Sequence, residues 1–291
     1  MKKIRENQNH MGVWGWCMFA FLTVYALLLL APYLIALISA FKTSSDFNAN
    51  IFGITKPSFD SIKDSFTQFT SQVILPDGSI GAYDFFGMTI NSFEYAVGGA
   101  LCLAFVPCIT AYCCARFKYF LSPILEWIVY ITMAIPIVGS QASAIQMAHK
   151  LGIYNSIPGQ WFMKCSFLGM YFLILHANFK SIPQDYSEAA YIDGAGNFSI
   201  FFKIMLPLVS NVLFLVFILQ FVHLWSDYTA PLYFFPDKPT LAFALLNIKE
   251  SNIAVPTLMA ACLLISLPSL TLYICFTDKF TTNMQVGGIK G

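Results

Sequence analysis

The stretch EAAYIDGAGNFSIFFKIMLP, residues 188–207, lies between two long apolar runs and decides the fold more than any other part of the chain. Ser187 comes directly before it and is a favoured residue type for the N-cap of a helix. Glu188 then lies in the first turn, where the helix dipole favours a carboxylate. Ala189 and Ala190 are small and allow another backbone to approach. The first half of the stretch therefore predicts a short helix with a small-residue surface.

A turn and further helical structure should follow this helix. Gly194 and Gly196 can adopt positive φ values and so turn the chain between two short helices. Pro207 suits the first turn of a new helix, because its missing N–H needs no partner there. The alternative is an ordinary loop that contacts only its own chain. Apolar residues recur at roughly helical spacing between these points and predict one helix face: Phe198, Phe201, Phe202, Met205 and Leu206.

The composition indicates a membrane protein. Hydrophobic residues make up 57% of the 291 residues and charged residues 11%, whereas a soluble domain has about 25% charged residues. The mean hydropathy is +0.66. The net charge of +1 gives no indication of nucleic-acid binding. The eight cysteines lie mostly inside apolar runs without metal-ligand spacing, so we expect thiols in membrane helices and no metal site.

Six apolar segments are long enough to cross a bilayer, which requires about 20 residues. Prolines occur in the third and sixth segments, and membrane helices tolerate them where neighbours satisfy the freed carbonyl groups. Gly98 and Gly99 predict a place on the second segment where another helix can approach closely. The expected fold class is an all-α membrane protein with six transmembrane helices, at residues 13–40, 88–114, 122–147, 160–179, 207–231 and 255–277.

Four sequence marks resemble one family of transport proteins. The spacing of Glu188, the alanine pair and Gly194 resembles the EAA motif of permeases in binding-protein-dependent ABC importers. The segment AYCCARF at residues 111–117 resembles the end of the second helix in MalG-type permeases of carbohydrate importers. The triplet WSD at residues 225–227 resembles that family's W-N-D, with serine in place of asparagine, and GGIKG at residues 287–291 is similar to the family's tail.

This resemblance implies the type I ABC importer permease fold, with both termini in the cytoplasm. Lysine and arginine residues alone set the orientation only weakly. The expected organisation is a cytoplasmic N-terminus at 1–12, a six-helix permease domain at 13–286 and a cytoplasmic tail at 287–291. Within the domain, we expect an extracytoplasmic loop at 42–87 and a cytoplasmic EAA coupling loop at 181–206.

The resemblance also implies a function. The chain would be the permease subunit of an ATP-driven importer that moves a carbohydrate, specifically an oligosaccharide, across the plasma membrane of a prokaryote by alternating access. Its partners would be a second homologous permease, two ATPase subunits and an extracytoplasmic solute-binding protein. No phosphate-binding loop occurs here, so ATP and Mg would be held by the ATPases and no cofactor by this chain. Residues implied in ATPase coupling are Glu188, Ala189, Ala190, Asp193, Gly194, Phe198, Leu206 and Pro207, with Gly287, Gly288 and Lys290 in the tail.

Polar residues within apolar segments indicate where a substrate could pass, because they usually face a bundle interior or a wet cavity. Gln220, His223 and Asp227 follow one another at i, i+3 and i+7, which predicts one face of the fifth helix. Two roles remain as alternatives for Gln220 and His223: lining the path, or hydrogen bonding to neighbouring helices. For Asp227 and Glu126 we favour structural pairs. The candidate path residues are Gln220, His223, Trp225, Asp227, Tyr228, Gln141 and Asn178.

Three alternatives have different signatures. A permease for a non-sugar solute would keep the EAA motif. A secondary transporter would show two related halves with broken helices, and the sequence has no such duplication. A membrane enzyme would need clustered catalytic side chains; the sequence shows none, so we expect a non-catalytic subunit.

Overall fold

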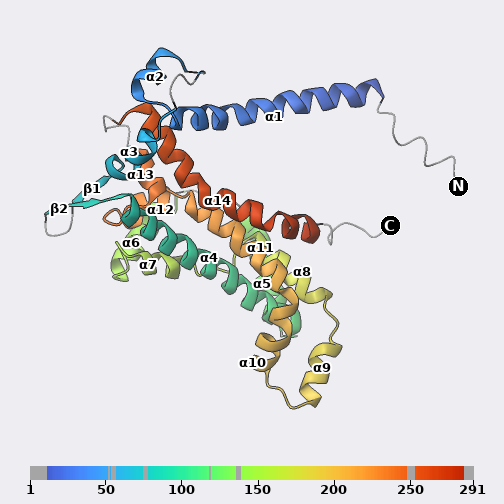
Figure 1. Ribbon diagram of the computed structural model, residues 1–291. Coiled ribbons are helices and arrows are strands. Elements are labelled where there is room, and N and C mark those ends of the chain that lie inside the picture. The colour runs from blue at the N-terminus through green and yellow to red at the C-terminus, as the bar shows by residue number, and fades with distance from the viewer. Residues whose placement is uncertain are drawn as a thin grey trace. The chain divides into compact units, whose positions relative to one another are not determined.

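The computed structural model describes residues 12–51, 53, 57–74, 78–117, 119–135, 139–247 and 253–284. Figure 1 colours the helices and strands along the chain. The chain divides into two compact units, each described separately below. The first is built from Met1–Phe69 and Ser251–Ser266, and the second from Thr70–Glu250 and Leu267–Gly291.

The first unit contains α1 (Val13–Ala40), α2 (Ser44–Ala49), α3 (Asp60–Gln68) and the first part of α14 (Val255–Met284). The most apolar 18-residue window of α1 has a mean hydropathy of 2.4, and none of it is buried in the protein. A helix that is apolar on all sides needs an apolar environment on all sides. This helix therefore matches the first predicted membrane segment.

The first unit also has a buried lysine that organises the chain after α1. Lys42 is fully buried, and its Nζ donates to the carbonyl oxygens of Asn50 at 2.6 Å and Ile51 at 2.8 Å. Ser61 Oγ donates to the Lys42 carbonyl oxygen at 2.6 Å. These bonds satisfy the buried ammonium group and connect Lys42 to residues 50–51 and to α3.

The second unit begins with a β-hairpin and the longest helix. Strands β1 (Ser71–Ile74) and β2 (Ile80–Tyr83) pair antiparallel, and α4 (Phe85–Arg116) follows. Asp84 begins α4 as its N-cap, because its Oδ1 accepts from the Gly87 amide at 2.9 Å.

Helix α4 is the centre of this unit. It lies along α11 (Leu206–Trp225) and α8 (Met170–Ser181), as Figure 1 shows. Gly98 and Gly99 make the close contacts that the sequence predicts. A Cβ on Gly98 would lie 2.1 Å from the Trp161 indole, and one on Gly99 would lie 2.6 Å from the Leu224 side chain. The core around α4 includes Ala104, Cys108, Ala111, Phe172, Leu175, Phe179, Met205 and Val209.

The third and fourth predicted segments are each divided, so the prediction of continuous helices over 122–147 and 160–179 is wrong. The third becomes α5 (Leu121–Ala134) and α6 (Gln141–Lys150), because Ile135 is extended, as residues before a proline prefer to be. The fourth becomes α7 (Ile157–Met163) and α8, separated by a link that ends at Gly169 with φ +125°.

The remaining helices form the predicted loop and its exit. Helix α9 (Asp185–Ile192) is followed, after a turn, by α10 (Asn197–Ile200). Helix α10 continues without interruption into the π-helical turn η2 (Phe201–Met205) and then α11. Two short helices, α12 (Thr229–Phe234) and α13 (Leu241–Asn247), come next. The fifth predicted segment therefore starts earlier than expected and ends at Trp225, not at residue 231.

The all-α membrane fold class is confirmed, with one small hairpin added. Among the described residues, four helices are long and apolar enough to span a membrane. The shorter α5 is also apolar. The count of six transmembrane helices therefore stays a prediction. The four spans are Val13–Ala40, Phe85–Arg116, Asn197–Trp225 and Val255–Phe276.

Candidate functional site

The candidate site is the loop that connects α8 to α11, where α9 and α10 extend past the ends of α4, α8 and α11 (Figure 1). Helix α9 begins at Asp185 after the N-cap residue Gln184. Ser187 is therefore inside the helix, and its prediction as N-cap is wrong. The helix starts three residues earlier, where Asp185 also provides a first-turn carboxylate. Glu188 lies in the first turn, as predicted.

The turn after α9 depends on one glycine. Gly194 has φ +81°; its amide bonds to the Tyr191 carbonyl at 3.0 Å, and the Ala195 amide bonds to the Ala190 carbonyl at 2.9 Å. This pair of bonds is the Schellman motif, which ends a helix with a residue of positive φ. Gly196 instead has φ −76° as the N-cap of α10, so the prediction of turn-forming glycines holds only at Gly194.

The loop has a buried side and an exposed apolar side. Tyr112 of α4 packs on Phe201, with ring centroids 4.8 Å apart, and α9 contributes Ala190 to the same core. On the outside, Phe198 is 82% exposed and Ile192 is 86% exposed. Exposed apolar residues gathered on one loop of a membrane protein indicate a surface for another protein.

The structure brings most of the predicted coupling residues together on this loop. Glu188, Ala189, Asp193 and Phe198 are exposed, while Ala190 is buried. The two alanines therefore have different surroundings: Ala190 packs on the core of its own chain and only Ala189 is open to a partner.

Leu206 and Pro207 lie at the start of α11, away from the turn. Pro207 does not begin a separate helix as predicted, because η2 joins α10 to α11. A π-helical turn bonds residue i to i+5, and here the Leu206 amide bonds to the Phe201 carbonyl. A widened turn of this kind accommodates a proline that lacks an amide hydrogen.

Two cavities flank α9. One of about 470 Å³ lies between α9 and the end of α4, and the other, of about 480 Å³, lies between α9 and Ile204. Burial raises the pKa of the Tyr119 phenol beside the first cavity, so this group stays neutral. The first cavity is lined by Tyr112, Arg116, Phe117, Tyr119, Gln184, Ser187, Glu188 and Tyr191.

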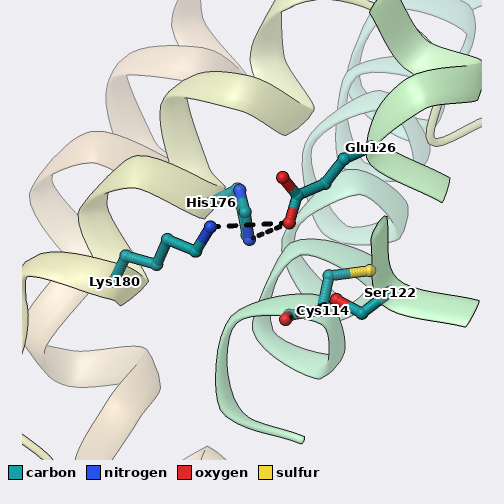
Figure 2. A network of polar contacts seen from close by, with 5 residues as sticks. All are labelled: Cys114, Ser122, Glu126, His176 and Lys180. Carbon is teal, nitrogen blue, oxygen red and sulfur yellow. Dashed lines mark hydrogen bonds and ion pairs between the residues drawn. The ribbon is translucent and has the colours of Figure 1, made fainter. Parts of the chain in front are cut away.

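A polar network holds the helix that leads into the loop (Figure 2). Glu126 Oε1 on α5 lies 3.2 Å from His176 Nε2 and 3.5 Å from Lys180 Nζ, both on α8. The His176 contact is within ion-pair distance but is not aligned as a hydrogen bond. Ser122 Oγ donates to the Cys114 carbonyl oxygen at 2.7 Å. Helix α5 is therefore attached to both α4 and α8, and Glu126 has the structural pair that its position suggested.

Of the candidate path residues, Gln220 and His223 share α11. Gln220 is buried and His223 is exposed. Asp227 lies beyond the end of α11, so its placement on the same helix face is wrong. Its Oδ2 accepts from the Tyr95 hydroxyl at 2.7 Å, and its Oδ1 accepts from the Thr229 amide at 2.8 Å. This carboxylate forms a structural pair.

The other candidate path residues lie in different surroundings. Trp225 is buried and packs on Phe93 with ring centroids 4.8 Å apart. Tyr228 is 48% exposed, and Gln141 is exposed on α6. Asn178 Nδ2 donates within α8 to the Ile174 carbonyl oxygen at 2.8 Å.

Some expectations are not addressed by the geometry. Gly287, Gly288 and Lys290 of the tail lie outside the described residues. No group of His, Cys, Asp and Glu side chains in the described ranges could hold a metal ion. The sequence did not single out Arg116 or Tyr112 for the loop, although both lie in the AYCCARF segment at the end of α4.

The fold defines the class of protein. It matches the solved structure of a bacterial ABC transporter involved in the import of the acidic polysaccharide alginate, with a TM-score of 0.73 and 17% identity. The match covers 92% of this chain and 96% of that chain. This chain therefore has the fold of the matched chain of that transporter.

The sequence comparisons establish the family. Residues 104–285 match the model for the binding-protein-dependent transport system inner membrane component, and the chain belongs to this family. It is 24% identical to the diacetylchitobiose uptake system permease protein NgcG of Streptomyces coelicolor, over 93% of this chain and 87% of that protein.

Two further relatives are similar over most of the chain. The melibiose/raffinose/stachyose import permease protein MelC of Bacillus subtilis is 26% identical over 89% of this chain and 91% of its own length. The sn-glycerol-3-phosphate transport system permease protein UgpE of Yersinia enterocolitica is 27% identical over 68% and 72% respectively. The chain is thus a transport subunit of an ABC importer and not a catalytic enzyme, and it works with ATPase and binding-protein partners.

Proposed function

We propose that this permease moves a carbohydrate, specifically an oligosaccharide, across the membrane, and that its α9–α10 loop is the docking site for the ATPase. The observation that carries the docking proposal is the exposed loop itself. The loop exposes apolar side chains together with Glu188, beyond the ends of α4, α8 and α11. Glu188 lies on α9, which ends at the Gly194 turn.

The proposed mechanism divides the work between subunits. ATP and Mg are bound by two ATPase subunits, and ATP-driven closure of these subunits displaces the α9–α10 loop. Because α10, η2 and α11 are continuous, a displacement of the loop reaches a membrane-spanning helix directly. The permease is then a two-state element whose equilibrium the ATPases shift.

The proposed assembly contains a second homologous permease and an extracytoplasmic solute-binding protein. Both termini and the α9–α10 loop face the cytoplasm of a prokaryotic cell. Residues 287–291 take part in coupling to the ATPases in this proposal. The segment at 42–87 then lies on the opposite side of the membrane, where the binding protein delivers the solute.

The carbohydrate assignment is supported by the substrates named for two relatives, diacetylchitobiose and the melibiose, raffinose and stachyose group. The AYCCARF segment and the GGIKG tail, which resemble carbohydrate-importer permeases, support the same class. A phosphorylated polyol is the second candidate, because a third relative imports sn-glycerol-3-phosphate.

The test is reconstitution of the permease with the ATPase and the binding protein that co-purify with it. ATP-dependent uptake is measured for a panel of oligosaccharides and for sn-glycerol-3-phosphate. Uptake of an oligosaccharide supports the main proposal, and uptake of the phosphorylated compound alone supports the second. Absence of a co-purifying ATPase would contradict the docking proposal.

A further inference from the structure

Arg116 contacts both ends of the segment that contains the α9–α10 loop. This arginine is the last residue of α4, and its Nη2 donates to the Ile182 carbonyl oxygen at 2.9 Å. The same nitrogen lies 3.7 Å from Met205 Sδ. Ile182 ends α8 as its C-cap and Met205 ends η2. A single side chain of α4 therefore spans the points at which the loop leaves and rejoins the helical core.

Close packing does not hold α9 against α4. A pocket of about 470 Å³ that is open to solvent lies between them. Ala190 is the buried residue of α9. The bond from Arg116 to Ile182 therefore adds a polar connection between α4 and the base of the loop to the packing of Tyr112 on Phe179 and Phe201.

The guanidinium group is incompletely paired in this state. Arg116 Nε is buried without a hydrogen-bond partner, and Ser187 Oγ on α9, beside the same cavity, is also buried and unpaired. Unpaired buried donors are unfavourable. A shift of α9 that brings an acceptor to Nε would relieve this cost, and the cavity leaves room for such a shift. The contact is thus compatible with two positions of the loop.

We propose that Arg116 is the positioning residue that transmits movement of the α9–α10 loop to α4. This inference rests on the proposed docking of the ATPase to that loop. Arginine suits the role because its charge is permanent and its planar fork can bond more than one acceptor at once, whereas lysine is a compact point charge. Since α4 lies along both α8 and α11, displacement of its end reaches the centre of the unit.

The test compares Arg116→Ala, Arg116→Lys and the control Lys203→Ala in the reconstituted complex. Lys203 is exposed on η2, outside the α9–α10 loop, so the control removes one positive charge without touching the Ile182 bond. The readout is the number of solute molecules transported per ATP hydrolysed. For Arg116→Ala we expect this ratio to fall about tenfold or more, because the hydrogen bond from a charged group is lost. Arg116→Lys should give an intermediate ratio, and Lys203→Ala the wild-type ratio.

The outcomes separate this inference from the docking proposal. If the wild-type complex shows no ATP-driven uptake, the proposed function itself fails. If it transports normally and Arg116→Ala keeps the wild-type ratio, Arg116 does not transmit movement. If Arg116→Ala does not assemble, Arg116→Lys decides: a wild-type ratio together with a lower melting temperature would show a structural role only and overturn the inference.

Discussion

Replacing Gly194 by valine tests whether the shape of the loop turn is needed for transport. Gly194 has φ +81°, a conformation that a β-branched residue adopts only with strain. Gly196 is two residues away and provides a matched control, because its φ is −76° with extended ψ, which valine adopts readily. A Cβ at either position would meet no atom within 4 Å. The two substitutions therefore differ mainly in backbone strain and not in crowding.

The strain gives the size of the expected effect. A residue held at an unfavourable φ costs about 1–3 kcal/mol, and each 1.4 kcal/mol is a factor of ten in an equilibrium. The population of the observed turn should therefore fall by about five- to 150-fold in Gly194→Val. The Schellman bonds at Gly194 and Ala195 would be lost with it. The spanning helices do not depend on this turn, so membrane insertion should be retained.

The assay is ATP-driven uptake and substrate-stimulated ATP hydrolysis of the reconstituted complex, with both variants at equal membrane content. Gly194→Val should lower both activities strongly, and Gly196→Val should leave both near the wild-type level. Equal activities in the two variants would refute the reasoning that a positive φ at Gly194 is needed. Normal stimulated hydrolysis in Gly194→Val would also count against docking at this loop.

Three further predictions concern other parts of the chain. Glu126→Gln removes the ion pair with Lys180 and the carboxylate contact with His176, and it should lower the melting temperature of the permease. Lys180→Ala removes only the more exposed partner and should lower it less. Equal melting temperatures would contradict the structural role of Glu126. If Gln220 and His223 line the path, replacing either by alanine should change the apparent affinity for solute about three- to tenfold, because a hydrogen bond of about 0.5–1.5 kcal/mol is lost. Wild-type kinetics with a lowered melting temperature would assign both residues to helix packing. Deleting residues 287–291 should leave the complex assembled but lower the solute transported per ATP, and an unchanged ratio would show that the tail has no part in coupling.

The sequence by itself predicted the fold class and the position of the loop. Both depend on local composition and spacing. An apolar run such as Val13–Ala40 is long enough to cross a bilayer whatever its neighbours are. Gly194 ends α9 because positive φ is open to glycine at little cost. The resemblance to a permease family rested on the same short motifs, and residues 104–285 match that family.

Helix boundaries inside the predicted segments were less predictable. The divisions of the third and fourth segments occur at Ile135 and before Gly169, where a proline neighbour and a positive φ outweigh an apolar pattern that continues across them. The π-helical turn before Pro207 was also not anticipated, because a helix can either end at a proline or widen to accept it. Packing of Phe201 on Tyr112 favours the continuous form here.

Contacts between distant residues were decided only by the tertiary structure. The pair formed by Tyr95 and Asp227 joins residues 132 positions apart, and the bond from Arg116 to Ile182 joins residues 66 apart. Neither pairing has a periodic or local signature, because each requires helices to be brought together first. The sequence could therefore place Asp227 near the end of a helix and Arg116 at the end of another, while their partners depended on how α4, α8 and α11 pack.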